Sequence, residues 1–359
     1  MKIAVIMHVS LSEGGGGFYE IKSQSEFLSR YGFEIHAYEP HSDIHPIING
    51  NVTYKDYKSK TLDFFTKMGR PGAFPMFLSI KLAEKYDIVY TFSPFYLLFL
   101  FINRKYLKST KKIIISTKDL LFPETALKRI LRRITIILYK LLNLKNVYIY
   151  NENSIESFLL KGIGIKTYEL RPLVNKNINC YSFRKNKQFT IFFLGPVEKR
   201  KGADNLFKLL KECRNRDILF IIAGKISKDY IELAKSFSCE NIQFLGKIDE
   251  ETKEKLLFCS DLGLMLSLAE SYSLVTREML MHGLPLITTW TPATAIYGDY
   301  GIFLANGFKE LYKKVLILQK EWLNSYDNYI KHREYILKKA NTIFNKKDLE
   351  REFLCIFLG

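Results

Sequence analysis

One short stretch of this chain, residues 270–285, restricts the fold more than any other. It reads ESYSLVTRE followed by MLMHGLP, so two carboxylates, Glu270 and Glu278, stand eight residues apart and a Gly-Leu-Pro sequence ends the apolar run. Strand-like apolar segments precede and follow it, at 261–266 and 286–289. Strand, loop, helix and strand make a βαβ unit, in which the helix begins at the carboxyl edge of a parallel sheet, where ligands bind. We therefore expect one acid in the loop and one in the first turns of the helix, both facing a ligand crevice.

Strand-like and helical patterns alternate along the rest of the chain. Short apolar runs predict strands, and the stretches between several of them predict helices, such as those at 18–31 and 203–213. The other predicted strands cover residues 2–9, 34–38, 87–92, 112–116, 147–150, 189–194, 218–223 and 242–245. Strands that alternate with helices indicate an α/β protein with parallel sheets, here in two successive Rossmann-like halves.

The length of 359 residues predicts two domains, since a typical domain has about 150 residues. The polar stretch at 175–187 has little periodicity and predicts the linker between them. It separates a Rossmann-like domain at 1–174 from a second one at 188–335. Beyond Gly307 the pattern is helical to the end of the chain, and we expect residues 336–359 to form a separate helical segment.

The chain is strongly basic. It has 54 Lys and Arg against 37 Asp and Glu, a net charge of +17, which implies an anionic partner: nucleic acid, a phospholipid surface or a phosphorylated ligand. No homeodomain, RRM, KH or zinc-finger pattern is present in the sequence, which argues against nucleic acid.

A basic amphipathic segment lies at residues 127–142. Its apolar residues fall on one stripe at three- and four-residue spacing, which is typical of a helix lying on an anionic membrane surface. The alternative, equally open from the sequence, is a helix whose stripe packs on the sheet and whose basic face is solvated. The stripe comprises Leu127, Ile130, Leu131, Ile134, Ile137, Leu138, Leu141 and Leu142, and the basic residues off it are Lys128, Arg129, Arg132 and Arg133.

The cysteines and the N-terminus favour a cytoplasmic protein. There are five cysteines, an odd number, with no C-x-x-C pair and no His neighbour at metal-ligand spacing, so free thiols in a reducing compartment are expected. The apolar run that begins at Lys2 is too short for a signal peptide, and no run approaches the roughly 20 apolar residues of a membrane-spanning helix.

Three motifs in the second half resemble those of retaining glycosyltransferases with the GT-B fold, in particular glycosyltransferase family 4. Residues 193–204, FLGPVEKRKGAD, are similar to the family's strand and glycine–lysine loop, and residues 244–248, FLGKI, to its strand–glycine turn. Residues 270–285 match its E-x7-E signature, with Ser271 and Ser273 where glycines are usual. The resemblance implies two Rossmann-like domains that face each other across a cleft, with the C-terminal helix returning to the N-terminal domain. It also implies that the N-terminal domain binds the acceptor and the C-terminal domain binds the nucleotide sugar.

The resemblance assigns roles to individual residues. Lys201 would stabilise the leaving diphosphate, Glu270 would contact the hydroxyls of the donor sugar, and Glu278 would accept hydrogen bonds from the ribose. The helix start would add backbone N–H and hydroxyl donors. The other donor-binding candidates are Ser271, Tyr272, Ser273, Leu274, Val275, Gly195, Gly246, Arg200, Lys199, Gly15 and Gly16.

The sequence departs from the family pattern in two places. Pro196 stands where an Arg is usual, so Lys199 or Arg200 would have to replace that cation. The His that commonly follows a strand of the N-terminal domain is absent, which leaves Lys118, Asp119 and His8 as candidate contacts for the sugar or the acceptor. No Asp-x-Asp pattern stands in a fitting position, so neither a metal nor another cofactor is expected.

Together these features predict the retaining transfer of a sugar from a UDP- or GDP-sugar to a glycan or lipid-linked acceptor, in polysaccharide or glycolipid synthesis. The protein would be cytoplasmic, with peripheral attachment to an anionic membrane surface through residues 127–142. Two alternatives remain open: a nucleotide-sugar 2-epimerase or phosphorylase on the same fold, and a nucleotide-sugar-binding subunit with weak or no activity.

Overall fold

The computed structural model describes residues 1–6, 16–39, 52–56, 85–91, 110–117, 130, 133–134, 136–137, 139–141, 146–151, 154–169, 183, 185–270, 272–297 and 301–358. The chain divides into two compact units. The N-terminal unit comprises Met1–Asn175 together with Lys346–Gly359, and the C-terminal unit comprises Lys176–Asn345. The predicted boundary near residue 175 coincides with this division, whereas the division near the C-terminus lies at Asn345, ten residues beyond the predicted one.

The N-terminal unit contains a parallel sheet with the strand order β3-β2-β1-β4-β5-β6-β7. The sequence predicted five of these strands and missed the short β3 and β7. The strands are β1 (Lys2–Ile6), β2 (Glu34–Glu39), β3 (Val52–Asp56), β4 (Ile88–Thr91), β5 (Lys112–Thr117), β6 (Val147–Asn151) and β7 (Thr167–Glu169). The helices that the structure describes in full are α1 (Gly16–Arg30), α6 (Ser154–Gly162) and α14 (Lys346–Leu358).

The C-terminal unit contains a second parallel sheet, with the order β10-β9-β8-β11-β12-β13. In both sheets the strand order reverses beside the first strand, which is the doubly wound arrangement. The strands are β8 (Phe189–Leu194), β9 (Ile218–Ala223), β10 (Ile242–Gly246), β11 (Leu262–Met265), β12 (Leu286–Thr288) and β13 (Ile302–Leu304). The helices are η3 (Lys199–Lys201), α7 (Ala203–Cys213), η4 (Lys228–Tyr230), α8 (Ile231–Phe237), α9 (Glu250–Cys259), α10 (Leu274–Met281), α11 (Pro292–Ile296), α12 (Phe308–Asn324) and α13 (Tyr326–Ile343).

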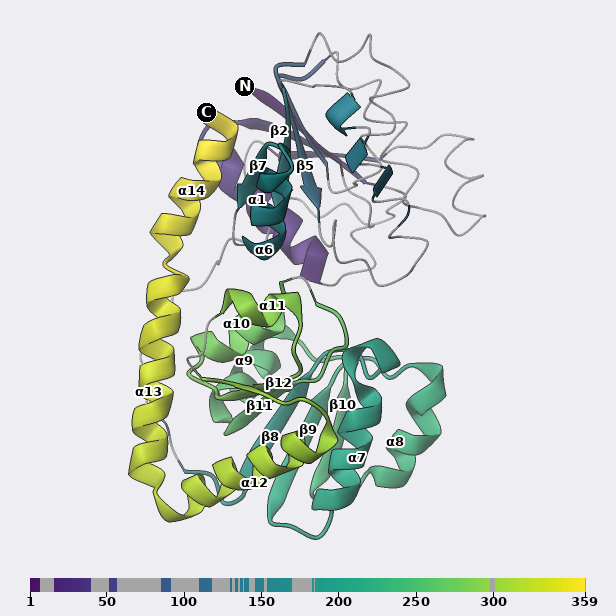
Figure 1. The fold of residues 1–359 in the computed structure, drawn as a ribbon, viewed down its shortest axis with the longest axis vertical. Helices are drawn as coiled ribbons and strands as arrows, with labels where there is room; N and C mark the ends of the chain where they lie inside the picture. Colours follow the sequence, from purple (N-terminus) through teal and green to yellow (C-terminus); the bar gives the residue numbers. More distant parts are fainter. Residues whose placement is uncertain are drawn as a thin grey trace. The chain divides into compact units, whose positions relative to one another are not determined.

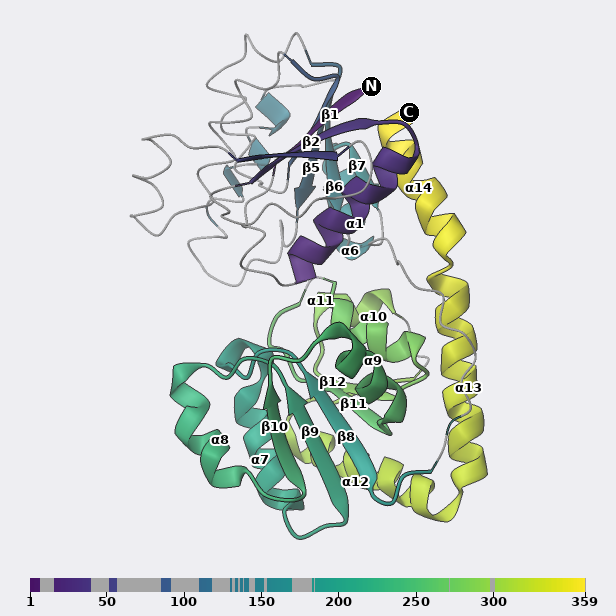
Figure 2. The same cartoon turned by 180° about the vertical axis from the view of Figure 1, so that it is seen from behind.

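Helices cover both faces of the second sheet, because its strands are apolar on both sides (Figures 1 and 2). In β8, Ile191 and Phe193 pack against α7 and α12 on one face, while Phe192 packs against α9 and α10 on the other. This alternation follows from the two-residue period of a strand, and burial on both faces explains why β8 reads as a continuous apolar run.

The last helix, α14, belongs to the N-terminal unit and lies beside α1 (Figures 1 and 2). Two of its phenylalanines provide the contact. The ring of Phe353 lies 5.9 Å from that of Phe27, and the ring of Phe357 lies 5.5 Å from Tyr90 and 6.4 Å from Phe33, all in edge-on geometry. The predicted return of the C-terminal helix to the N-terminal domain is therefore confirmed. None of the described helices is long and apolar enough to cross a bilayer.

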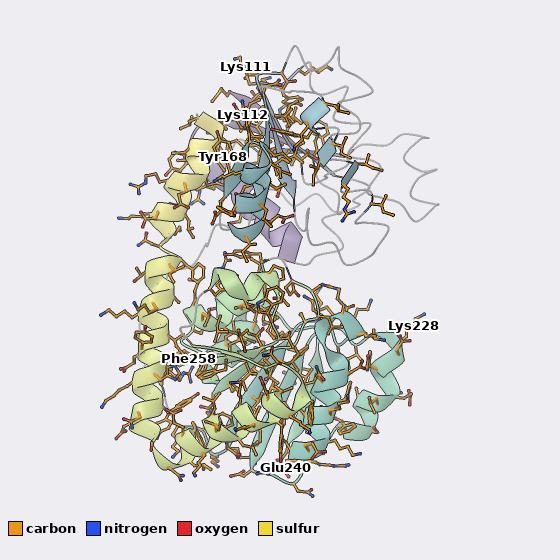
Figure 3. The ribbon with its side chains drawn as sticks, viewed as in Figure 1. Lys111, Lys112, Tyr168, Lys228, Glu240 and Phe258 are labelled. Atoms are coloured by element: carbon orange, nitrogen blue, oxygen red, sulfur yellow. The ribbon has the colours of Figure 1, made fainter. Side chains whose placement is uncertain are left out.

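A buried arginine fixes α13 to the C-terminal unit. Arg333 is only 2% exposed, and its guanidinium donates to the carbonyl oxygens of Ser260 (2.9 Å), Gly283 (3.0 Å), Phe258 (3.4 Å) and His282 (3.4 Å). Phe258, labelled in Figure 3, lies beside α13. The guanidinium also lies 4.1 Å from the centre of the Phe183 ring. One side chain thus donates hydrogen bonds to carbonyls at the C-terminal ends of both α9 and α10. Helix α10 carries Glu278.

We predict that Arg333→Met destabilises the C-terminal unit by about 3 kcal/mol, because it leaves several buried carbonyls without donors. Urea unfolding followed by tryptophan emission measures this, since both tryptophans, Trp290 and Trp322, lie in this unit. The matched control is Lys338→Met on the exposed side of the same helix, for which we expect less than about 0.5 kcal/mol. Equal losses for the two variants would contradict the role assigned to Arg333.

Candidate functional site

The loop after β8 approaches the loop after β11 very closely at Gly202. This residue ends η3 and precedes α7, with a left-handed φ of 81°. A methyl group added to it would lie 2.0 Å from the carbonyl oxygen of Leu266, so only glycine fits. The two loops are also joined by a hydrogen bond of 2.8 Å from the Leu268 N–H to the Arg200 carbonyl. The glycine of the predicted Lys-Gly loop therefore brings two neighbouring loops together at the carboxyl edge of the sheet.

This contact places Lys201 against Glu270. The ammonium of Lys201 donates to Glu270 Oε1, and so does the Ser267 hydroxyl, at 3.0 Å. A guanidinium nitrogen of Arg200 lies 4.0 Å from the same oxygen, while the other terminal nitrogen pairs with Glu198 at 3.2 Å. The side chains of Lys201 and Glu270 are 22% and 14% exposed, so the pair is shielded from bulk water and yet reachable.

The second acid, Glu278, has a lysine partner of its own. Lys253 of α9 donates to Glu278 Oε1 at 2.7 Å and also pairs with Glu250 at 2.8 Å. Burial disfavours the charged form of Lys253, but the two carboxylates more than offset this and hold its pKa above the usual value. Lys253 is therefore an ammonium at neutral pH, and it holds the Glu278 carboxylate in place at the start of α10.

The first turn of α10 has an unusual backbone. Ser273 precedes the helix with φ 60°, the only left-handed φ at a non-glycine residue in the part of the chain that the structure describes. Such a conformation costs about 1 kcal/mol for a residue with a side chain. The Ser273 hydroxyl offsets part of this cost, since it accepts from the Thr276 N–H at 3.3 Å. The Tyr297 hydroxyl also donates to the carbonyls of Tyr272 (2.6 Å) and Ser273 (3.0 Å). Serine thus adopts here the backbone conformation that the usual glycine would allow.

Three glycines line the carboxyl ends of β8, β9 and β10. The Gly195 N–H donates to Ala223 O at 2.9 Å, and the Gly224 N–H donates to Gly246 O at 2.7 Å. Gly224 is essential to this packing, since an added methyl group would lie 2.0 Å from Gly195 O. In contrast, no described atom lies within 4 Å of a methyl group added at Gly195 or Gly246, so the backbone is open to an approaching ligand on that side.

Of the remaining predicted residues, three begin helices, two lie elsewhere in the second unit, and five are not described by the structure. Leu274 and Val275 are the first two residues of α10, and Gly16 is the first residue of α1. Lys199 is an exposed residue of η3, and Tyr272 is buried. Ser271, Gly15, Lys118, Asp119 and His8 lie outside the described residues.

The sequence analysis did not predict two residues that contact the acids: Ser267, which bonds to Glu270, and Lys253, which bonds to Glu278. Ser267 comes two residues after the end of β11 and directly after the predicted strand at 261–266, which was an available signal. Lys253 had no signal beyond its spacing from Glu250, which predicts only a helix-surface pair. His282, at the C-terminal end of α10, has a structural role: it is 5% exposed, and its ring bonds to Glu278 O at 2.7 Å and to Glu254 at 3.1 Å. Among the described residues, no three His, Cys, Asp or Glu side chains gather in a way that could hold a metal ion.

In the N-terminal unit, the four described residues of the amphipathic segment's apolar stripe are exposed. Its described residues are helical, and Ile130, Ile134, Ile137 and Leu141 are 57%, 44%, 56% and 65% exposed. At about 100° per residue these four lie within an arc of roughly 60°, and Tyr139 lies nearly opposite. Tyr139 is 5% exposed and donates to Val147 O at 3.0 Å, which fixes its side of the helix to the sheet. For these four residues the core-facing alternative is wrong.

A family of known proteins matches the segment in which the candidate site lies. Residues 178–300 match the family model for glycosyl transferases group 1. This segment contains the Lys201 loop, Glu270 and Glu278. An uncharacterized 41.2 kDa protein in the cps region of Klebsiella pneumoniae is 25% identical over 185 residues, which are 51% of this chain and 49% of that protein. The chain therefore matches about half the length of this relative.

Solved structures match the chain over nearly its whole length. The sucrose-phosphate synthase of Thermosynechococcus elongatus has a TM-score of 0.74 at 13% identity, covering 99% of this chain and 98% of that one. HepE from Anabaena, solved with UDP-glucose, has a TM-score of 0.71 at 14% identity, with 99% of each chain covered. WaaG, a glycosyltransferase involved in lipopolysaccharide biosynthesis, has a TM-score of 0.68 at 15% identity, covering 99% and 98%. The fold is that of the GT-B glycosyltransferases.

We predict that Gly202→Ala destabilises the C-terminal unit by more than about 3 kcal/mol, because the methyl group collides with the Leu266 carbonyl. The matched control is Gly246→Ala. That residue also has a left-handed φ, 67°, but open space around it, so only the conformational cost of about 1–2 kcal/mol applies. Urea unfolding followed by tryptophan emission measures both. If the two variants lose the same free energy, the close approach of the two loops is not the constraint described above.

Proposed function

We propose that this protein is a retaining glycosyltransferase of family 4, which transfers a sugar from a UDP- or GDP-sugar to a glycan or lipid-linked acceptor. The observation that carries the proposal is the cluster of Lys201, Arg200 and Glu270 at the carboxyl edge of the second sheet. The cluster lies within the segment that matches the group 1 glycosyl transferase model. HepE, of the same fold, has been solved with UDP-glucose, which supports a nucleotide sugar as the donor.

In the proposed reaction, the bond between the anomeric carbon and the diphosphate oxygen breaks while the acceptor hydroxyl bonds to that carbon. The electron pair leaves on the diphosphate, and the hydroxyl proton passes to the diphosphate or to solvent. Negative charge therefore develops on the diphosphate, where aligned cations and dipoles stabilise it most. Lys201, Arg200 and the N-terminus of α10 would supply this stabilisation. Arg200, which lies 4.0 Å from Glu270, would replace the arginine that is usual at the position of Pro196.

The two acids would bind the neutral parts of the donor. Glu270 would accept hydrogen bonds from the hydroxyls of the sugar, and Glu278 would accept those of the ribose. Lys253 occupies Oε1 of Glu278, so the lone pairs of Oε2 remain the natural acceptors for the ribose. No metal or other cofactor is assigned a role, because the charge on the diphosphate would be met by the side chains named above.

We expect loss of the Lys201 cation to lower turnover and loss of the Glu278 carboxylate to weaken donor binding. Lys201→Gln should lower the turnover number by at least about 100-fold, because the cation acts on charge that develops in the transition state. Glu278→Ala should raise the KM for the donor about 10- to 100-fold, through the loss of hydrogen bonds to a carboxylate. Release of nucleoside diphosphate from UDP- and GDP-sugars measures both, in buffer containing EDTA.

The control for these variants is Lys208→Ala, an exposed cation on α7 that should leave both constants unchanged. Unchanged turnover in Lys201→Gln together with an unchanged KM for the donor in Glu278→Ala would refute the assignment of the site. Donor binding without turnover in the wild-type protein would instead support a nucleotide-sugar-binding subunit.

We further propose that the protein acts at the cytoplasmic face of an anionic membrane, with its acceptor bound by the N-terminal unit. The exposed stripe of Ile130, Ile134, Ile137 and Leu141 supports this, because it offers apolar side chains to a bilayer interface. Arg133 and Lys140 are exposed on the same helix, and the chain carries +17 overall, so the surface suits acidic headgroups.

The protein should co-sediment with vesicles containing phosphatidylglycerol at low salt, and less so at high salt, where charges are screened. The double variant Ile134→Asp, Ile137→Asp should weaken this binding by at least about tenfold, because two apolar side chains no longer enter the interface. Ile317→Asp, at an equally exposed isoleucine (53%) on α12, is the control and should bind as the wild type does. Equal binding by the double variant, or no binding by the wild type, would refute the membrane proposal.

A further inference from the structure

One tryptophan is exposed beside the acid of the candidate donor site. Of the two tryptophans, Trp322 is 2% exposed within the core, whereas Trp290 is 60% exposed. Trp290 follows β12, which pairs with β11 so that Thr288 stands beside Met265. Parallel neighbours are about 4.8 Å apart, so the loop of Trp290 adjoins the loop that carries Glu270.

Hydrogen bonds fix the Trp290 loop to both ends of the Glu270 loop. On one side of Trp290, the Thr289 hydroxyl donates to Ser267 O at 2.5 Å. On the other side, the Ala293 N–H donates to Glu270 O at 3.0 Å. The three residues between these two bonds, Trp290, Thr291 and Pro292, are therefore held beside the Glu270 loop, and Trp290 is 60% exposed.

The Glu270 loop, which adjoins the loop of Trp290, carries both polar and apolar groups. The Ser267 hydroxyl and the Lys201 ammonium direct the Glu270 carboxylate, and Leu268, 61% exposed, adds a second apolar side chain on the same loop. Ligand sites typically pair an aromatic or apolar wall with a few fixed polar groups. A hexose ring matches both, because its hydroxyls project from its edge and its C–H groups lie on its faces.

We propose that Trp290 is a stacking platform for the pyranose ring of the donor sugar. The indole would cover a C–H face of the ring while Glu270 accepts hydrogen bonds from its hydroxyls. This inference rests on the proposed function and adds a residue that contacts the sugar part of the donor and not its nucleotide part. Trp290 would contribute to affinity for the nucleotide sugar and not to affinity for the nucleotide alone.

The two tryptophans make the proposal directly measurable. Tryptophan emission of the full chain is recorded during titration with UDP-glucose and GDP-mannose, and in parallel with UDP and GDP. We expect the nucleotide sugar that binds to shift or quench the emission, and its nucleotide alone to leave the emission nearly unchanged. In Trp290→Phe the shift should disappear, since buried Trp322 is the remaining fluorophore.

Calorimetry on variants separates stacking from a structural role. Trp290→Ala should bind the nucleotide sugar about three- to tenfold more weakly than the wild type and bind the nucleotide equally well. Trp290→Phe keeps a ring and should retain most of the affinity. An emission change that is equal for nucleotide and nucleotide sugar, or unchanged affinity in Trp290→Ala, overturns the stacking role. If the wild type binds no nucleotide sugar, the proposed function fails, and the stacking role fails with it.

Discussion

The close approach of Gly202 to the Leu266 carbonyl is the constraint on which the candidate site depends. A side chain at position 202 would separate the loops that follow β8 and β11. With glycine there, Lys201 reaches Glu270, and Arg200 accepts a backbone hydrogen bond from Leu268. This backbone contact between Gly202 and Leu266, 64 residues apart in sequence, brings the side chains of the two loops into one charged cluster at the edge of the sheet.

Each of the two acids, Glu270 and Glu278, forms an ion pair with a different lysine. Glu270 is paired with Lys201, and Glu278 with Lys253 from a different helix. Both pairs are partly buried, and the ion pairs offset the cost of taking these groups out of water. Arg333 of α13 stabilises this arrangement, because it donates hydrogen bonds to carbonyls at the C-terminal ends of α9 and α10. Helix α9 carries Lys253, and helix α10 carries Glu278. The geometry thus places the cations Lys201, Arg200 and Lys253 beside the two carboxylates at the carboxyl edge of the sheet.

Much of this arrangement could be predicted from the sequence, and the reasons differ from element to element. Strands buried on both faces, such as β8 and β9, read as continuous apolar runs and were predicted to within a residue. The edge strand β13 has only three residues, and an apolar run as short as residues 302–305 does not distinguish a strand from a turn or a helix. The pairing of Lys253 with Glu278 depends on how α9 packs beside α10, which no local spacing encodes. Whether the amphipathic stripe is exposed was likewise undetermined, because periodicity defines a face but not what covers it. The buried Tyr139, opposite Ile130, Ile134, Ile137 and Leu141, shows that these four face away from the sheet.

The central claim is that the carboxyl edge of the second sheet binds a nucleotide diphosphate sugar. A thermal-shift screen of the wild-type protein against UDP, GDP, ADP and their sugars tests it most directly, because a ligand that binds the native state must stabilise it. We expect one nucleotide and its sugar to raise the melting temperature of the C-terminal unit by about 5–10 °C at a concentration 100-fold above the dissociation constant, where binding contributes about 2.7 kcal/mol. Unchanged melting with every nucleotide and nucleotide sugar at millimolar concentration would contradict it.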